Sequence, residues 1–281
     1  MFRTIGYCFS GAGPDPHANH GPLLFQPHLN ESLFAHGQML YPKGNDTHQN
    51  VIQLNTQLCE LIHLYLQQNI TPLVISADHS SAMGTWSGVA KYTKHPIGLI
   101  WVDAHLDAHT PTSSITQNLH GMPVAHLLGK GDNALRHIGT LDPKINPEYL
   151  VYIGTRDYEP DELALIQNTP ATIYTMQDIK TQGIKTILQK AVQHVSQCPH
   201  GYGLSLDIDA FDPDEIPAVS TPAINGIHFD EFCHAVEALD QLSLMALEIT
   251  EYNANLDQNE RTLKAITGLI HQLAAKNQAS I

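Results

Sequence analysis

The chain has 281 residues, a length that one α/β domain with a sizeable core can reach, and we expect a single domain over residues 1–281. Its 14 Lys and Arg face 28 Asp and Glu, so the formal net charge is −14 with histidine taken as neutral. An acidic chain without a basic run argues against a nucleic-acid backbone or an anionic membrane surface as partner.

The first residues, MFRTIGYCFS, lack the basic and then apolar layout of a signal peptide. No apolar run approaches the roughly 18 residues that a membrane helix needs. The cysteines lie far apart and form no C-x-x-C pair; they are Cys8, Cys59, Cys198 and Cys233. Thiols spaced in this way are typical of a reducing compartment, so we expect a cytoplasmic protein.

Short apolar runs alternate with segments of helical periodicity, and several runs are continuous, as in a parallel sheet covered on both faces. We expect strands at Thr4–Phe9, Leu73–Ser76, Ile97–Val102, Leu150–Gly154, Thr172–Thr175, Gly203–Leu206 and Met245–Ile249. We expect helices at Asn50–Gln68, Ser81–Thr93, Pro160–Gln167, Asp178–Ser196, Phe229–Leu239 and Asn259–Lys276. The alternation predicts a three-layer α/β/α fold with a mainly parallel, doubly wound central sheet.

Three of the expected strands end in acidic and imidazole side chains instead of ordinary turn residues. The segments are SADHS, VDAHLDAHT and SLDIDAFDP, which begin at residues 76, 102 and 205. Their acids and imidazoles include His79, Asp103, His105, Asp107, Asp207 and Asp209. Alternation in extended chain sends every second side chain to one side, and parallel strands deliver their ends to one edge. We therefore expect four carboxylates and two imidazoles in one crevice.

Four carboxylates gathered without cations repel one another, so they must take up protons or move apart. Two divalent ions supply the positive charge that removes this conflict. The oxygen-rich donor set without thiolates favours hard or borderline ions such as Mn²⁺ over a structural zinc cage. Two such ions can hold a hydroxide between them, which predicts a hydrolase. Asp78 and Asp212 have the ordinary interpretation of helix N-caps or turn residues.

Together the three segments resemble those of the ureohydrolases, the arginase and agmatinase family of binuclear manganese hydrolases. The resemblance implies a homo-oligomer, a trimer or a hexamer, with two Mn²⁺ per subunit. One ion would be held by His79, Asp103, Asp107 and Asp207. The other would be held by Asp103, His105, Asp207 and Asp209. Asp103 and Asp207 would thus bridge the ions, and Asp107 would accept a hydrogen bond from the bridging hydroxide.

The loop Thr110–Pro123 resembles the arginase loop that recognises the α-carboxylate of the substrate. Thr116 and Asn118 lie at its hydroxyl and amide positions. His109 stands where arginases commonly carry an asparagine in contact with that carboxylate. His120 matches the family's proton-shuttling histidine; without the resemblance, it reads as a histidine at a helix start.

Two acidic segments complete the resemblance. In GTRDYEPDE, Asp157 and Glu159 match arginase acids that receive the α-amino group, with Glu162 farther away, although alone these are ordinary first-turn helix residues. In LEITEYN, Glu251 matches the acid that binds the guanidinium, since a carboxylate accepts a guanidinium fork in two hydrogen bonds. Thr221 lies at a family position that lines the same pocket.

The resemblance implies hydrolysis of L-arginine to L-ornithine and urea by attack of the metal-bridging hydroxide, with Asp107, His120 and Glu251 as catalytic residues. The closest alternatives are agmatinase, guanidinobutyrase or formimidoylglutamase activity on the same metal site. Agmatine has no carboxylate, so it would leave the carboxylate-binding positions idle. A single-zinc deacetylase needs the ligands of one ion only. A non-catalytic metal-binding homologue has no need of His120 or Glu251.

Overall fold

The computed structural model describes residues 1–139 and 143–277. Its strands are β1 Phe2–Tyr7, β2 Phe34–Ala35, β3 Met39–Leu40, β4 Thr71–Ser76, β5 Ile97–Val102, β6 Ile145–Thr155, β7 Thr172–Thr175, β8 Tyr202–Asp207 and β9 Leu244–Thr250. In these described residues they form one sheet of nine strands in the order β2-β1-β4-β9-β8-β5-β6-β7, with β3 also paired to β1. All the pairings are parallel, and every expected strand is present; β2 and β3 are additional.

The α-helices are α1 Gly21–Phe25, α2 Thr47–Gln67, α3 Ala82–Thr93, α4 Pro123–Leu127, α5 Asn133–Arg136, α6 Pro160–Gln167, α7 Met176–Gln182, α8 Ile184–Val195, α9 Phe229–Glu237 and α10 Arg261–Lys276. Short 3-10 helices lie at η1 Gln26–His28, η2 His79–Ser81, η3 Leu119–Gly121 and η4 Ile208–Ala210. The prediction of one continuous helix over Asp178–Ser196 is wrong. Gly183 has φ 80°, a left-handed value that glycine tolerates and a helix does not, and it separates α7 from α8.

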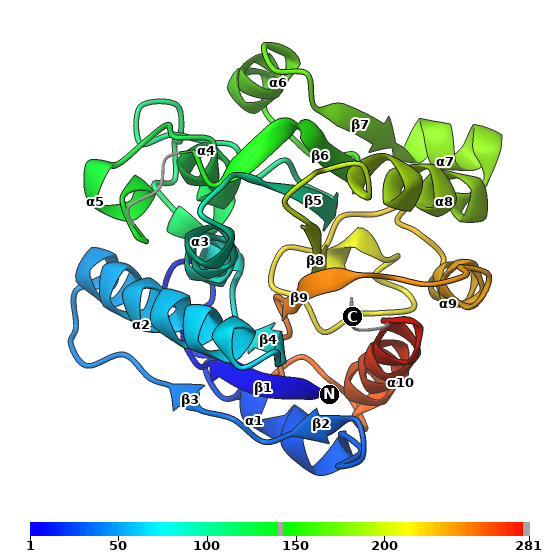
Figure 1. The fold of residues 1–281 in the computed structure, drawn as a ribbon, viewed down its shortest axis with the longest axis horizontal. Coiled ribbons are helices and arrows are strands. Elements are labelled where there is room, and N and C mark those ends of the chain that lie inside the picture. The colour runs from blue at the N-terminus through cyan, green and yellow to red at the C-terminus, as the bar shows by residue number, and fades with distance from the viewer. Residues whose placement is uncertain (140–142, 278–281) are drawn as a thin grey trace.

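Helices cover both faces of the sheet, which confirms the three-layer α/β/α prediction. Figure 1 shows α2, α3 and α4 on one side and α8, α9 and α10 on the other. Each layer closes its own apolar core, one around Trp86 and Leu54 and the other around Phe232 and Ile266. Among the described residues, no helix is both long and apolar enough to cross a membrane.

The strand register fixes where the functional loops begin. Ile75, Ile249, Leu206 and Val102 pair in one row across β4, β9, β8 and β5. Because these four neighbouring strands are parallel, the residues that follow the row leave the sheet at the same edge. The loops after β4, β5, β8 and β9 therefore meet in space although they are far apart in the sequence.

Candidate metal centre

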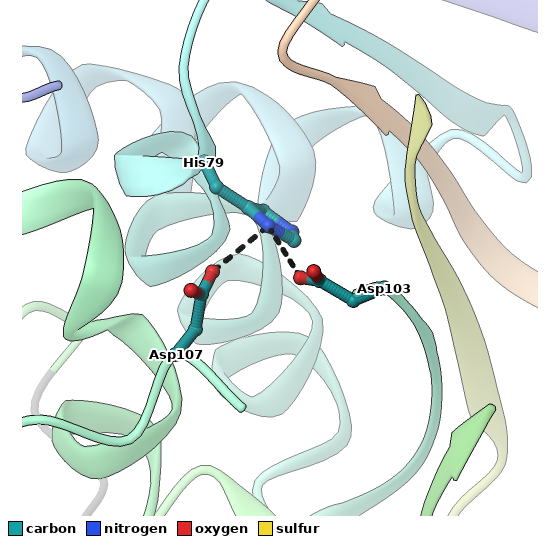
Figure 2. A group of neighbouring side chains, drawn as sticks. All are labelled: His79, Asp103 and Asp107. Carbon is teal, nitrogen blue, oxygen red and sulfur yellow. Dashed lines mark ion pairs between the residues drawn. The ribbon is translucent and has the colours of Figure 1, made fainter. Parts of the chain in front are cut away.

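His79 is the centre of the first group of candidate ligands. Its Nδ1 atom lies 3.3 Å from Asp103 Oδ2, 3.0 Å from Asp107 Oδ2 and 3.1 Å from Asp207 Oδ2. Figure 2 shows His79, from the segment after β4, and Asp103 and Asp107, from the loop after β5, pointing toward one another. All of these side chains are buried. One imidazole nitrogen and three carboxylate oxygens therefore surround a common point.

His105 organises a second group beside the first. Its Nδ1 atom lies 3.4 Å from Asp103 Oδ1 and 3.2 Å from Asp209 Oδ2. Asp103 thus turns one oxygen toward each histidine, the arrangement of a carboxylate that bridges two ions. The second oxygen of Asp207 accepts the N–H of Asp209 at 3.0 Å. The structure brings together the six side chains that the sequence pattern groups.

The loops reach this arrangement by turning, not by the extended alternation expected from the sequence. The prediction of an extended chain is wrong, since Asp107 has φ 49° and Asp209 lies in η4. Asp103 Oδ1 accepts the N–H of His105 at 2.7 Å, and Asp207 repeats this contact with Asp209. Aspartate side chains favour such turns two residues on. The same residues therefore shape the loop and point oxygens into the crevice.

Asp78 and Asp212 have the structural roles expected of them. Asp78 is the N-cap of η2 and accepts hydrogen bonds from Ser80 N at 2.9 Å and Ala12 N at 3.1 Å. Asp212 accepts the N–H groups of Asp214 and Gly226, each at 3.1 Å. Neither belongs to the groups of candidate metal ligands.

A buried hydrogen-bond chain orients the ring of His79. Its Nε2 atom lies 2.9 Å from Ser205 Oγ, and Ser205 donates its proton to Glu248 Oε2 at 2.8 Å. Ser205 Oγ must therefore accept the proton on His79 Nε2, which leaves the lone pair of Nδ1 for the crevice. Glu248 is fully buried and accepts further bonds from Ser81, Thr85 and Trp86.

Trp101 contacts one residue shared by both ligand groups, Asp103, and one residue of the first group, His79. Its indole N–H donates to Asp103 Oδ2 at 2.8 Å, and its ring stacks on His79 with centroids 4.1 Å apart. Sequence reasoning missed Trp101, Ser205 and Glu248. The available signal was position, because Trp101 and Ser205 each stand two residues before a ligand aspartate and share its side of the strand.

The electrostatics of the cluster call for a cation. Burial, Asp209 and Asp103 raise the pKa of Asp207 well above its usual range, and burial and Asp103 raise the pKa of Asp107 to about 6. Burial acts to lower the pKa of His79, but its carboxylate neighbours raise it well above the ordinary value. Within the described chain, buried His79 Nδ1 makes no hydrogen bond. These donors fit divalent metal ions, whose charge would relieve the repulsion.

A cavity of about 320 Å³ opens over the ligand groups. Asp107, Asp207, Asp209 and His105 line its inner end, and Thr221 donates to Asp209 Oδ2 at 3.1 Å. The remaining lining residues are Pro14, His109, Ser114, Ile115, Thr116, Asn118, His120, Gly121, Glu159 and Glu162. The cavity therefore connects the metal ligands with the hydroxyl, amide and acidic groups that the sequence assigned to an amino-acid end.

His120 separates Glu251 from the cavity. Its Nδ1 atom lies 3.0 Å from Glu251 Oε1, which also accepts the N–H of His79 at 2.8 Å. Glu251 is buried, has φ 68° and is not among the lining residues. Burial acts to lower the pKa of His120, but Glu251 raises it to about 9. His120 therefore carries a second ring proton at neutral pH and lines the cavity.

The three acids after β6 occupy different positions around the cavity. Glu159 lines the cavity, whereas Asp157 lies 3.9 Å from His105 Nε2 and lines a neighbouring hollow. Glu162 is buried and accepts the N–H groups of Ala108 and Glu159, each at 3.1 Å. Burial and contact with Glu159 raise the pKa of Glu162 to about 8. Glu159 and Glu162 thus both line the cavity, Glu159 with an exposed side chain and Glu162 with a buried one.

The loop after β1 also reaches the cavity, which sequence reasoning missed. Ala12 accepts the N–H of His120 at 3.2 Å, and Pro14 lines the cavity. Asp15 accepts a hydrogen bond from Asn253 at 2.7 Å, which ties this loop to the segment after β9. Its Asp15, His17 and His20 show no metal-ligand spacing, so only the tertiary position of the loop assigns it to the cavity.

Paired His and Asp ligands at the carboxyl edge of a parallel sheet define the centre of a metal-dependent hydrolase. A model of the arginase family matches residues 27–275. The arginase of Bacillus caldovelox is 35% identical over 249 residues, which cover 87% of this chain and 83% of that protein. The arginase of Brevibacillus brevis is 38% identical over 221 residues, covering 78% of this chain and 74% of that protein.

The solved structure of the arginase from Bacillus subtilis superimposes with a TM-score of 0.88 at 30% identity, covering 99% of both chains. The chain belongs to the arginase family, and it is a metal-dependent hydrolase.

Proposed function

We propose that this chain hydrolyses L-arginine to L-ornithine and urea on two Mn²⁺ ions. The observation that carries the proposal is a single cavity with hydrolytic metal ligands at its inner end and Thr116, Asn118 and Glu159 around the rest. L-Arginine matches these two ends of the cavity, because its guanidino group and its amino-acid group lie at opposite ends of a short carbon chain. The family relatives named as arginases support the same substrate.

We assign one ion to His79, Asp103, Asp107 and Asp207, and the other to Asp103, His105, Asp207 and Asp209. Imidazole nitrogens with several carboxylates suit Mn²⁺. When bound, two such ions lower the pKa of a water molecule toward neutrality. Asp107 is placed to accept a hydrogen bond from that water, since it lies both in the first ligand group and on the cavity wall.

The remaining steps use side chains of the cavity. Glu251 binds the guanidinium group of the substrate. This contact replaces the hydrogen bond between Glu251 and His120. As the bond between the guanidino carbon and the δ-nitrogen breaks, His120 gives a proton to the leaving amine. Thr116 and Asn118 bind the α-carboxylate, and Glu159 binds the α-ammonium group. Thr221 donates a hydrogen bond to Asp209, and Asp157 lies close to His105.

A substrate panel tests the assignment. Wild-type protein loaded with Mn²⁺ should release urea from L-arginine with a higher kcat/KM than from agmatine, because agmatine cannot use the carboxylate-binding groups Thr116 and Asn118. A preference for agmatine, 4-guanidinobutyrate or formimidoyl-glutamate would replace the substrate while leaving the metal centre in place.

Three further expectations belong to this proposal. We expect residues 1–281 to act as one ureohydrolase domain, since the two apolar cores share a single sheet. We expect a homo-oligomer, a trimer or a hexamer by resemblance to the family. We expect a cytoplasmic location, in keeping with free cysteines throughout, three of which are buried.

A further inference from the structure

His109 occupies the cavity wall in an arrangement that the metal centre does not require. Its ring lies between two side chains, with Nδ1 3.0 Å from Ser113 Oγ and Nε2 2.8 Å from Glu159 Oε2. Only 13% of the His109 side chain is exposed, whereas 62% of the Glu159 side chain is. A largely buried ring thus contacts a carboxylate that is largely exposed.

The carboxylate sets the direction of this contact. Glu159 as a carboxylate can only accept a hydrogen bond, so the 2.8 Å contact requires a proton on His109 Nε2. On the other side of the ring, His109 Nδ1 lies 3.0 Å from Ser113 Oγ, which accepts the N–H of Thr110 at 2.9 Å and donates to Thr110 O at 3.4 Å. The chain Thr110–Ser113–His109–Glu159 therefore runs from fixed backbone to an exposed carboxylate.

The bond to His109 leaves part of Glu159 available. The contact uses Oε2, and the Glu159 side chain also takes part in a capping box with Glu162 at the start of α6. Glu162, the neighbouring acid, is committed to the backbone N–H groups of Ala108 and Glu159. Of the two acids that line this end of the cavity, Glu159 is the accessible one, with 62% of its side chain exposed against 4% for Glu162.

We propose that His109 is a positioning residue, which holds the Glu159 carboxylate where it receives the α-ammonium group of an amino-acid substrate. This inference rests on the proposed function and assigns the selectivity for the ammonium group to the His109–Glu159 pair. Because the Glu159 carboxylate is held in place before the substrate binds, less conformational entropy of its side chain is lost on binding. Direct contact between His109 and the substrate carboxylate is the competing role, but both ring nitrogens already have partners.

The two roles predict different substrate dependence. L-Arginine carries both an α-ammonium and an α-carboxylate group, whereas 5-guanidinopentanoate carries the carboxylate alone. His109→Ala should raise KM for L-arginine about tenfold, with kcat within about twofold, and should leave KM for 5-guanidinopentanoate unchanged. An equal loss on both substrates, or no loss on L-arginine, overturns the inference.

Two further variants separate positioning from a general structural effect. In His109→Gln the amide nitrogen can replace the Nε2 donor, so this variant should recover most of the KM for L-arginine. His228→Ala is the matched control, because His228 forms a 2.8 Å contact with Glu215 away from the cavity, and it should behave as wild type. His109→Ala and Glu159→Gln should also be non-additive in KM; additive effects contradict the coupling.

A binding measurement separates failure of this inference from failure of the proposed function. L-Ornithine has the same α-groups without a guanidinium, and 5-aminopentanoate lacks only the α-ammonium group. By calorimetry, His109→Ala should weaken L-ornithine binding about tenfold and leave 5-aminopentanoate binding unchanged. If wild type turns over L-arginine but His109→Ala binds L-ornithine normally, the inference alone fails. If wild type neither turns over L-arginine nor binds L-ornithine, both fail.

Discussion

The hydroxyl group of Ser205 accepts the Nε2–H of His79 at 2.9 Å, and this contact decides which nitrogen of His79 faces the metal ligands. The direction follows from Glu248, a buried carboxylate that accepts the Ser205 proton at 2.8 Å. A candidate metal ligand is therefore oriented from the far side of its ring, through residues that do not line the cavity.

Ser205→Ala should weaken Mn²⁺ binding by about tenfold to 100-fold, because the ring of His79 loses the partner that fixes its tautomer and orientation. Competition with a metal-binding dye at constant pH measures this. The control is Ser87→Ala, which removes a buried hydroxyl in α3 outside the ligand groups and should bind Mn²⁺ as wild type does. Equal affinity in both variants would remove Ser205 from the metal centre.

Arg156→Lys should lower the free energy of unfolding by about 2–4 kcal/mol, because a lysine cannot reach the carbonyl groups that the guanidinium now joins. These acceptors belong to Gly154, Asp209, Ala210, Phe211, Ala223 and Ile224. Chemical denaturation in the presence of EDTA measures the loss. Arg261→Lys, which loses a single contact with an exposed carbonyl group, should change the free energy of unfolding by about 0.5 kcal/mol or less.

The metal-free protein should become less stable as the pH rises from about 5 to about 8. Burial and neighbouring acids raise the folded-state pKa of Asp107 to about 6 and that of Glu162 to about 8. A group with a raised folded-state pKa contributes its full stability below the unfolded-state pKa, and the contribution is lost as the pH passes the folded-state pKa. Asp103 and Glu251 have lowered pKa values and titrate below this range, so their contribution to stability stays constant across it.

Thermal unfolding with EDTA and with Mn²⁺ across this range tests the prediction. Mn²⁺ binds the deprotonated ligands, so the increase in Tm on adding Mn²⁺ should grow with pH. A gain in Tm that is constant or shrinks as the pH rises would show that proton loss from the cluster is not linked to metal binding.

His120→Asn should lower kcat by about 100-fold or more, because the cavity loses the group that is protonated at neutral pH and placed to serve the leaving amine. Mn²⁺ content should remain that of wild type, since His120 is in neither ligand group. A kcat within about threefold of wild type, at full metal content, would assign the proton to another donor.

The sequence was sufficient for the main strands of the sheet and for the cluster of candidate metal ligands, because both depend on residue types with few alternative uses. Short runs of strand-forming residues predicted β5 and β7 to the residue, and four acids at strand ends predicted the crevice. The local geometry was less accessible. The left-handed φ of Asp107 and the break at Gly183 are backbone states that composition does not reveal.

Residues assigned only by tertiary position were beyond the sequence. Pro14 lines the cavity because the β1 loop is tied to the segment after β9, a relationship between distant parts of the chain. His109 was identified as unusual, but its two partners depend on the fold of Thr110–Ser113 and on the placement of Glu159. Hydrogen-bond partners, rather than residue types, separate the roles of these side chains.

Metal content and urea release, measured together, test the central claim most directly. Wild-type protein should bind two Mn²⁺ per subunit and release urea from L-arginine only when loaded, whereas Asp209→Ala and His105→Ala should lose this turnover because each removes a ligand of the second group. Undiminished urea release by either variant, with the protein shown to carry metal, would contradict a hydrolytic centre built on these residues.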